Sequence, residues 1–152
     1  MLKVGDTAPD FTATTQDGDV HLYGLLATGP VILYFYNRDF TPACTAQAKK
    51  FRDMKEDLAS TNAHVVGVSP DGVESHQNFV KQLVLGFPLV ADPDKRIMKL
   101  FGIRSFLGIV DRVTLVIDRN KVVRHVERSM LDVDRHASAA LNTLKGLEAP
   151  PV

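Results

Sequence analysis

Two apolar runs mark the centre of the predicted fold. Residues 31–36 are continuously apolar and rich in β-forming types, and residues 64–69 have a similar apolar core. Strands that are buried on both faces have this pattern, whereas a half-exposed strand alternates apolar with polar positions. We therefore expect both segments to lie in the middle of a sheet that is covered on both sides.

The segment between these two runs follows a helical period. Phe51, Met54 and Leu58 recur at spacings of three and four residues, which predicts one helix with these side chains on its inner face. Thr41 is a good N-cap residue, and Pro42 suits the first helical position because its missing N–H would have no partner there. The helix is therefore expected to begin directly after Thr41.

The rest of the chain shows further helical periods and further strands. The strands are expected at residues 88–91, 113–118 and 122–128, and the last two form an antiparallel hairpin around Asn120, a residue that tolerates positive φ. Gly102 and Gly146 are expected to end the last two helices. The inward-facing apolar residues of the three helices are Val73, Val80, Leu83 and Val84; Ile97, Leu100 and Phe101; and Val133, Ala137, Ala140, Leu141 and Leu144.

The order of these elements indicates a fold class. An N-terminal β-hairpin extension comes first, then alternating strands and helices, then an antiparallel pair and a closing helix. This order fits an α/β protein with a central mixed sheet flanked by helices. No internal repeat is present, so residues 1–147 are expected to form one domain and residues 148–152 a frayed C-terminal tail.

Length and composition agree with this picture. The 152 residues are 45% hydrophobic, which is enough for a single core. Eighteen Lys and Arg balance eighteen Asp and Glu, so the chain lacks the charge that nucleic-acid or anionic-membrane binding usually needs. The chain shows no signal-peptide pattern and no apolar run near the roughly 20 residues that span a bilayer. We expect a cytoplasmic protein that binds neither nucleic acid nor membrane.

Motifs for common cofactors are absent from the sequence. The chain contains no Gly-x-Gly-x-x-Gly, no phosphate-binding P-loop and no Gly-x-Ser-x-Gly turn. The histidines are scattered, without a His-x-x-x-His pair or a nearby cysteine, and are expected to be surface or strand residues. They are His21, His64, His76, His125 and His136. No metal, haem or flavin is implied.

Cys44 is the only cysteine, which excludes an internal disulfide, a Cys-x-x-Cys pair and a tetrathiolate zinc site. A free cysteine is usually an inert, buried hydrophobic residue. Here it is expected to be the third residue of a helix that follows a buried strand. The first-turn N–H groups and the helix dipole favour a thiolate at that position, and open α/β sheets bind ligands at that edge. A reactive thiol is therefore the better interpretation.

Four short segments together resemble the peroxiredoxin family. In chain order they are Gly5-Asp-Thr-Ala-Pro-Asp-Phe11, Tyr34-Phe-Tyr36, Thr41-Pro-Ala-Cys-Thr45 and Phe51-Arg-Asp53. The similarity extends from about residue 2 to about residue 145 and is to the bacterioferritin-comigratory-protein (peroxiredoxin Q-like) branch. The resemblance implies a thioredoxin-like fold and a thiol-dependent peroxidase that needs no cofactor.

The resemblance also implies roles for individual residues. Cys44 matches the peroxidatic cysteine, Thr41 its hydroxyl partner, and Arg112 a catalytic arginine at the start of a late strand. From the residues alone, Arg112 would be interpreted as a surface residue paired with Asp111 or Asp118. The Thr41 hydroxyl could serve either the helix N–H groups or the thiolate and peroxide. The substrate pocket is expected to include Tyr36, Asn37, Phe40 and Gln47.

Three positions depart from the family pattern. Asn37 replaces a proline, Gln47 replaces a glutamate that is frequent in the branch, and Lys49 replaces a resolving cysteine found in many members. The chain is therefore a one-cysteine variant, and an external thiol, either a thioredoxin-like protein or a low-molecular-weight thiol, must reduce its sulfenic acid. Hydrogen peroxide and alkyl hydroperoxides are the substrates that the resemblance implies.

Two questions stay open at this level. Because Asn37 replaces the family's proline, an alternative function stays open. In that alternative, a thioredoxin-fold protein with weak or lost peroxidase activity acts as a redox sensor, a partner-binding module or a holdase. Residues 106–110 are too apolar for a free loop, and they either fold into the core, wall the peroxide entrance or form a subunit contact. The protein is accordingly expected to be a monomer or a homodimer.

Overall fold

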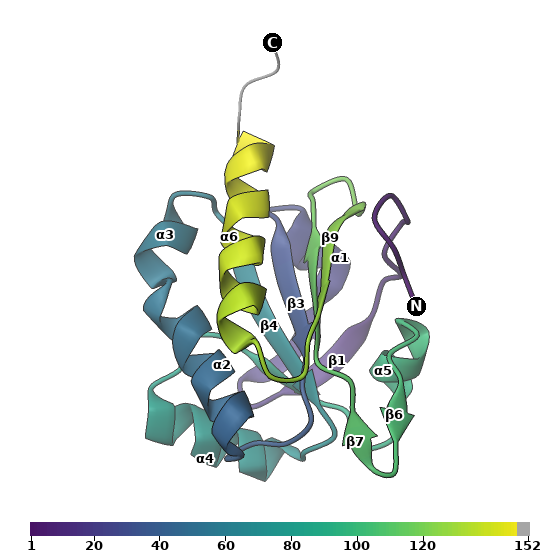
Figure 1. Ribbon diagram of the computed structural model, residues 1–152, viewed down its shortest axis with the longest axis vertical. Coiled ribbons are helices and arrows are strands. Elements are labelled where there is room, and N and C mark those ends of the chain that lie inside the picture. Colours follow the sequence, from purple (N-terminus) through teal and green to yellow (C-terminus); the bar gives the residue numbers. More distant parts are fainter. Residues whose placement is uncertain (149–152) are drawn as a thin grey trace.

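The computed structural model describes residues 1–148, which form one mixed sheet between two layers of helices (Figure 1). The strand order in the sheet is β2-β1-β5-β4-β3-β8-β9, and a separate two-stranded hairpin pairs β6 with β7. The strands are β1 Thr12–Thr15, β2 Gly18–His21, β3 Val31–Phe35, β4 His64–Ser69, β5 Leu89–Ala91, β6 Ser105–Phe106, β7 Ile109–Val110, β8 Val113–Ile117 and β9 Val123–Arg128.

The helices lie between these strands and after the last one. They are α1 Leu22–Leu26, α2 Pro42–Asp53, α3 Lys55–Ala59, α4 Val73–Leu83, α5 Arg96–Leu100 and α6 Val133–Glu148. None of the helices described is long and apolar enough to cross a membrane. The central strands β3, β4 and β5 are parallel, and the outer pairs are antiparallel. The mixed α/β fold expected from the sequence is confirmed.

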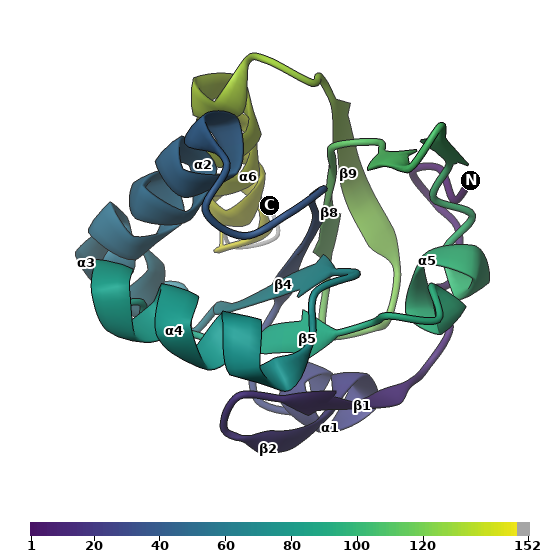
Figure 2. The ribbon, with the colours of Figure 1, turned by 90° about the horizontal axis from the view of Figure 1, so that it is seen from below.

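Side chains of the central strand alternate between two apolar cores. Val31, Leu33 and Phe35 point into a core that is closed by α1 and α5, while Ile32 and Tyr34 point into a second core beneath α2, α4 and α6. Figure 2 shows these two helical layers on opposite sides of the sheet. All five residues of β3 are buried, as the apolar run predicts. Cys44 belongs to the second core.

Several predicted boundaries need correction. The single helix expected through Leu58 is two helices, because Met54 leaves the helical conformation at φ −87° and ψ 6° between α2 and α3. The last helix, α6 Val133–Glu148, passes through Gly146, so Gly146 is not its C-terminal stop. In the β8–β9 turn the positive φ falls on Lys121 rather than Asn120. Of the predicted tail, residues 149–152 lie outside the described part of the chain.

The inward faces of two helices also differ from the prediction. Helix α4 buries His76, Phe79 and Leu83, whereas Val84 ends the helix at φ +56° and is 77% exposed. Helix α5 buries Ile97 and Met98 and leaves Leu100 exposed. Gly102 follows α5 with φ +69°, the left-handed C-terminal conformation expected of it.

The apolar segment before Arg112 does not fold into the core as a whole. It forms the β6–β7 hairpin, whose side chains Phe106, Leu107 and Ile109 are 77%, 85% and 53% exposed. Val110 alone is buried, at the base of the hairpin. Figure 1 shows the hairpin projecting beside α5, at the end of the sheet where α2 begins.

We predict that Gly67→Ala will destabilise the fold by about 1–3 kcal/mol, the usual cost of overpacking a core. A Cβ at Gly67, in the middle of β4, would lie 2.7 Å from Leu89 Cδ2 and 2.9 Å from the Tyr34 ring. Urea unfolding measures the change. Gly86→Ala is the matched control, since nothing lies within 4 Å of its added Cβ, and equal losses in both variants would contradict the packing argument.

Candidate active site

Cys44 lies where a central strand passes into a helix. Strand β3 ends at Phe35, residues 37–41 form a short loop, and α2 begins at Pro42. Thr41 is extended (φ −74°, ψ 150°) and its carbonyl accepts the first helical hydrogen bond, from Thr45 N at 2.8 Å. This start of the helix matches the sequence prediction. It places Cys44 in the first turn of α2, 2% exposed, at the carboxyl end of the parallel strands.

The strand register brings Arg112 to the same edge of the sheet. Phe35 at the end of β3 is paired with Val113 at the start of the antiparallel strand β8. Arg112, one residue before Val113, therefore lies next to the β3–α2 connection, although 68 residues separate it from Cys44 in the sequence. The surface ion pair considered for Arg112 is absent, because the residue is 4% exposed and Asp111 pairs with Arg128 instead.

Each nitrogen of the Arg112 guanidinium donates to a different acceptor. One terminal nitrogen donates to Cys44 Sγ at 3.2 Å, and the other donates to Gln47 Oε1. Nε donates to the Met130 carbonyl at 3.0 Å, and the Arg112 backbone N–H contacts Met130 Sδ at 3.2 Å. The side chain is thus held as a fixed fork. None of these acceptors is a carboxylate, so the thiol is the only ionisable one.

The site favours the thiolate form of Cys44. Burial of the thiol raises its pKa, but hydrogen bonding from the Arg38 backbone and the Thr41 side chain, together with the positive charge of Arg112, more than offsets this effect. The result is a pKa below the ordinary value of the thiol. Cys44 therefore has the electropositive, hydrogen-bonded surroundings that distinguish a reactive cysteine from an inert one.

Thr41 does not cap the helix through its side chain. Its hydroxyl makes no cap hydrogen bond and donates to the Arg38 carbonyl at 2.9 Å. Among the two alternatives for Thr41, the structure therefore does not support the first, a role in capping the helix N–H groups.

The four residues expected in the substrate pocket have different surroundings. Gln47 is fully buried against Arg112, and Tyr36 is buried and donates to Asp39 at 2.6 Å. Asn37 Oδ1 accepts from Val110 N at 3.1 Å and so attaches the β6–β7 hairpin to the loop before α2. Phe40 is 48% exposed, with its ring against Phe79.

Two buried polar atoms near the site have no hydrogen-bond partner. They are Tyr34 Oη and Gln47 Nε2. Burial first, and then the negative charges of Asp39 and Cys44, raise the pKa of Tyr34 well above its ordinary value, so its hydroxyl stays protonated. Both groups are consequently uncharged hydrogen-bond donors in the second core.

A cavity of about 300 Å³ opens beside the arginine. It is lined by Asp111, Arg112, Arg128, Ser129 and Met130. A larger cavity of about 450 Å³ lies elsewhere, between α3, the start of β4 and residues 84–88. Cys44 is not among the residues that line that cavity.

The expectation that the histidines are surface or strand residues is wrong for His76 and His136. Both are fully buried and lie on helices. His136 contacts Thr114 Oγ1 at 2.7 Å and the Ser129 carbonyl at 2.8 Å, and burial first, with the Arg112 charge, lowers its pKa. It thereby supports β8 and the β9–α6 connection next to Arg112.

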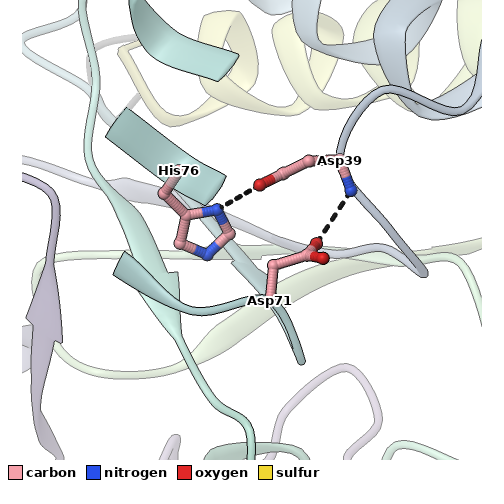
Figure 3. Close-up of side chains that lie close together, drawn as sticks. All are labelled: Asp39, Asp71 and His76. Carbon is pink, nitrogen blue, oxygen red and sulfur yellow. Dashed lines mark hydrogen bonds and ion pairs between the residues drawn. The ribbon is translucent and has the colours of Figure 1, made fainter. Parts of the chain in front are cut away.

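His76 belongs to the one cluster with metal-ligand geometry among residues 1–148. Asp39, Asp71 and His76 place one ligand atom each within 4.8 Å of one another. Figure 3 shows the three side chains close together. Both nitrogens of His76 and both carboxylate oxygens of Asp39 already take part in protein hydrogen bonds. The cluster is thus a satisfied hydrogen-bond network, and its atoms do not fit a metal ion.

The sequence analysis overlooked Asp39, Met130 and these two histidines. Asp39 is adjacent to the reactive motif, and a polar residue beside a buried strand end could have identified it. Met130 acts through its carbonyl, which leaves no sequence signal. His76 lies on the apolar period of its helix, with Phe79 and Leu83, and a histidine at such a position indicates a buried hydrogen-bonded ring.

Comparison with protein families matches residues 4–126 to the AhpC/TSA family. The crystal structure of peroxidoxin BcpB from Mycobacterium tuberculosis superposes with a TM-score of 0.92 at 37% identity, covering 98% of this chain and 100% of its own. A bacterioferritin comigratory protein of Xanthomonas campestris, studied for alkyl peroxide reduction, superposes at 0.81 and 28% identity over 90% and 91% of the two chains.

A third structure bears on the single cysteine. The yeast mitochondrial 1-Cys peroxiredoxin, whose thiol is resolved through the glutathione and thioredoxin systems, superposes with a TM-score of 0.86 at 25% identity, over 97% of this chain and 77% of its own. The chain therefore belongs to the AhpC/TSA family of peroxiredoxins, which are thiol-dependent peroxidases. Within that family it is a thioredoxin-like protein of the bacterioferritin-comigratory-protein branch, with one cysteine.

We predict that Cys44 titrates below the ordinary thiol pKa of about 8.5. Ultraviolet absorbance of the thiolate as a function of pH measures the midpoint, with Cys44→Ser as the blank. Since ionisation is favoured in the folded chain, the thiolate stabilises the fold above about pH 8.5, and this contribution is lost as the pH falls through the folded-state pKa. A midpoint at or above 8.5 would contradict an activated thiol.

Proposed function

We propose that Cys44 is the peroxidatic thiol of a one-cysteine peroxiredoxin that reduces hydrogen peroxide and alkyl hydroperoxides, with Arg112 and Thr41 completing the catalytic site. The observation that carries this proposal is the buried contact of 3.2 Å between the Arg112 guanidinium and Cys44 Sγ. The alkyl peroxide reduction named for the Xanthomonas relative supports the second substrate class.

In the first half-reaction the Cys44 thiolate attacks one oxygen of the peroxide in line with the O–O bond. An S–O bond forms and the O–O bond breaks, and the departing oxygen takes up a proton to leave as water or an alcohol. The sulfur loses two electrons and becomes a sulfenic acid. Arg112 donates to the peroxide oxygens as negative charge moves between them. The Thr41 hydroxyl donates its proton to the Arg38 carbonyl, so its oxygen can accept a hydrogen bond from the peroxide O–H.

In the second half-reaction an external thiol attacks the sulfenic sulfur. A mixed disulfide forms with loss of water, and a second thiol then releases reduced Cys44 and carries away the disulfide. A thioredoxin-like protein or a low-molecular-weight thiol can supply both electrons, as the two systems named for the yeast relative do in that protein. We place this cycle in the cytoplasm, where thiols are kept reduced, in a protein with a single domain over residues 1–147 that acts as a monomer or homodimer.

The pocket residues support the peroxidase rather than the sensor or holdase alternative. Asn37 replaces the family's proline, but its amide oxygen is bonded to Val110 N and so does not compete for the peroxide. Gln47 keeps Arg112 in place without neutralising its charge. We place Tyr36 behind the peroxide because it is buried, and Phe40 and the hairpin residues toward solvent because they are exposed.

Stopped-flow oxidation of the purified protein by stoichiometric peroxide tests the proposal. We expect Arg112→Lys to slow oxidation about ten- to hundredfold although it preserves the charge. Lysine loses the fork geometry, and a charge-assisted hydrogen bond is worth about 1.5–3 kcal/mol. Arg124→Lys, at an exposed arginine paired with Asp118, is the matched control and keeps the wild-type rate. A wild-type rate no faster than that of a free thiol would rule out the peroxidase.

The absence of a second cysteine leads to a separate prediction. Without reductant, excess peroxide should add about 32 and then about 48 Da to each chain, as sulfinic and sulfonic acid form at Cys44. With a low-molecular-weight thiol, a mixed disulfide should be trapped instead. Intact mass spectrometry distinguishes these products, with Cys44→Ser as the unreactive control. Peroxide consumption without oxygen addition, mixed disulfide or Cys44-linked dimer would exclude the one-cysteine mechanism.

A further inference from the structure

The loop between β3 and α2 is held by a buried carboxylate that the mechanism does not use. Asp39 is 3% exposed and lies in the middle of residues 37–41, between Arg38 and Phe40. Its side chain accepts three hydrogen bonds, from Tyr36 Oη at 2.6 Å, from Ser75 Oγ at 2.8 Å and from His76 Nδ1 at 2.7 Å. The last two donors are on α4, so one side chain ties the loop to a helix more than 30 residues away.

The partners of His76 determine how the protons are placed. Its Nε2 lies 2.9 Å from the Val90 carbonyl of β5, which can only accept, so Nε2 carries a proton. The other ring nitrogen faces the Asp39 carboxylate, and a second proton lies between them. Whichever atom holds that proton, the pair of Asp39 and His76 is neutral as a unit, which is why both side chains can be completely buried.

The backbone of the same loop is fixed from a second side. Asp39 N donates to Asp71 Oδ2 at 2.8 Å, and the Ser69 hydroxyl donates to the same oxygen at 2.7 Å, so the end of β4 also holds the loop. Figure 3 shows Asp39 joined to His76 through its side chain and to Asp71 through its backbone nitrogen. The next residue, Phe40, has φ +68°, a strained conformation for a bulky side chain. Such a conformation persists only where neighbouring contacts enforce it.

We propose that Asp39 and His76 are positioning residues for the peroxidatic thiol, because their buried pair locks the loop 37–41 in the conformation that presents the Arg38 backbone and Thr41 to Cys44 Sγ. The hydrogen bonds of these two side chains go to other groups and not to the sulfur. They act through the loop, which lies between the pair and the thiol. The proposal rests on Cys44 being the reacting group.

The backbone of Arg38 links Asp39 to the thiol. Its hydrogen bonding to Cys44 favours the thiolate, and its carbonyl accepts from the Thr41 hydroxyl. Both interactions depend on the orientation of a single residue, immediately before Asp39. If Asp39 loses its anchor, the strain at Phe40 can relax, and the groups that stabilise the thiolate turn away from the sulfur while Arg112 stays in place.

The first test is Asp39→Asn, which preserves shape but points an amide NH2 group at donors that need an acceptor. We expect the Cys44 titration midpoint to rise by about one pH unit, the effect of roughly one hydrogen bond to a charged group. Below the midpoint the oxidation rate should fall about tenfold, and it should recover at high pH. The matched control is Asp92→Asn, a carboxylate of similar burial that instead accepts from Ile97 N and Met98 N.

Asp92→Asn should lower the unfolding midpoint in urea and leave the Cys44 titration unchanged. A folded Asp39→Asn protein with the wild-type titration midpoint would overturn the proposal and leave Asp39 a purely structural residue. Because the readout is the titration of the thiol, it does not depend on peroxidase activity. Failure of the proposed function would instead appear as slow oxidation of the wild-type protein.

A second pair of variants keeps the test decisive if Asp39→Asn fails to fold. The amide of His76→Asn reaches about as far as Nδ1 and can still donate to Asp39, whereas that of His76→Gln reaches about as far as Nε2 and keeps only the Val90 contact. We expect the asparagine variant to retain a midpoint near wild type and the glutamine variant to shift upward. Equal midpoints in the two variants would overturn the proposal.

Discussion

The buried contact between Arg112 and Cys44 is the interaction on which the site depends. A guanidinium that is 4% exposed is costly unless an acceptor of negative charge is near. The other acceptors, Gln47 and the Met130 carbonyl, are neutral, so the ionised thiol supplies the compensating charge. The arginine activates the cysteine and the thiolate makes burial of the arginine tolerable. Each group explains the state of the other.

The scaffold supplies the precision that this contact needs. Central strand β3 ends where its partner β8 begins, and this register places the loop 37–41 and Arg112 at one edge of the sheet. A slip of one residue would turn Arg112 to the opposite face. The loop is fixed in turn by α4 and β4 through Asp39. Strand β8 thus positions the thiol through Arg112, and α4 and β4 position it through the loop 37–41. Helix α2 itself contributes its first turn.

The sequence predicts the layout of this fold better than its details. The apolar run at residues 31–36 and the Thr41-Pro42 pair predict the buried strand and the helix start because both depend on local chemistry. Periodicity fails at Met54 and at Gly146, where packing decides whether a helix breaks or continues. The contact of Arg112 with Cys44 depends on strand pairing across 68 residues, which no local pattern encodes. Resemblance to a family supplied that residue, while Asp39 and His76 became visible only in three dimensions.

The 68 residues between Cys44 and Arg112 affect when the thiol becomes activated during synthesis of the chain. During synthesis Cys44 leaves the ribosome well before Arg112, and β8 can pair with β3 only after the later segment has emerged. Until then the nascent chain carries an ordinary thiol without its guanidinium partner. Activation of the cysteine coincides with completion of the fold, so the unfinished chain is protected from the oxidant that the finished enzyme is built to meet.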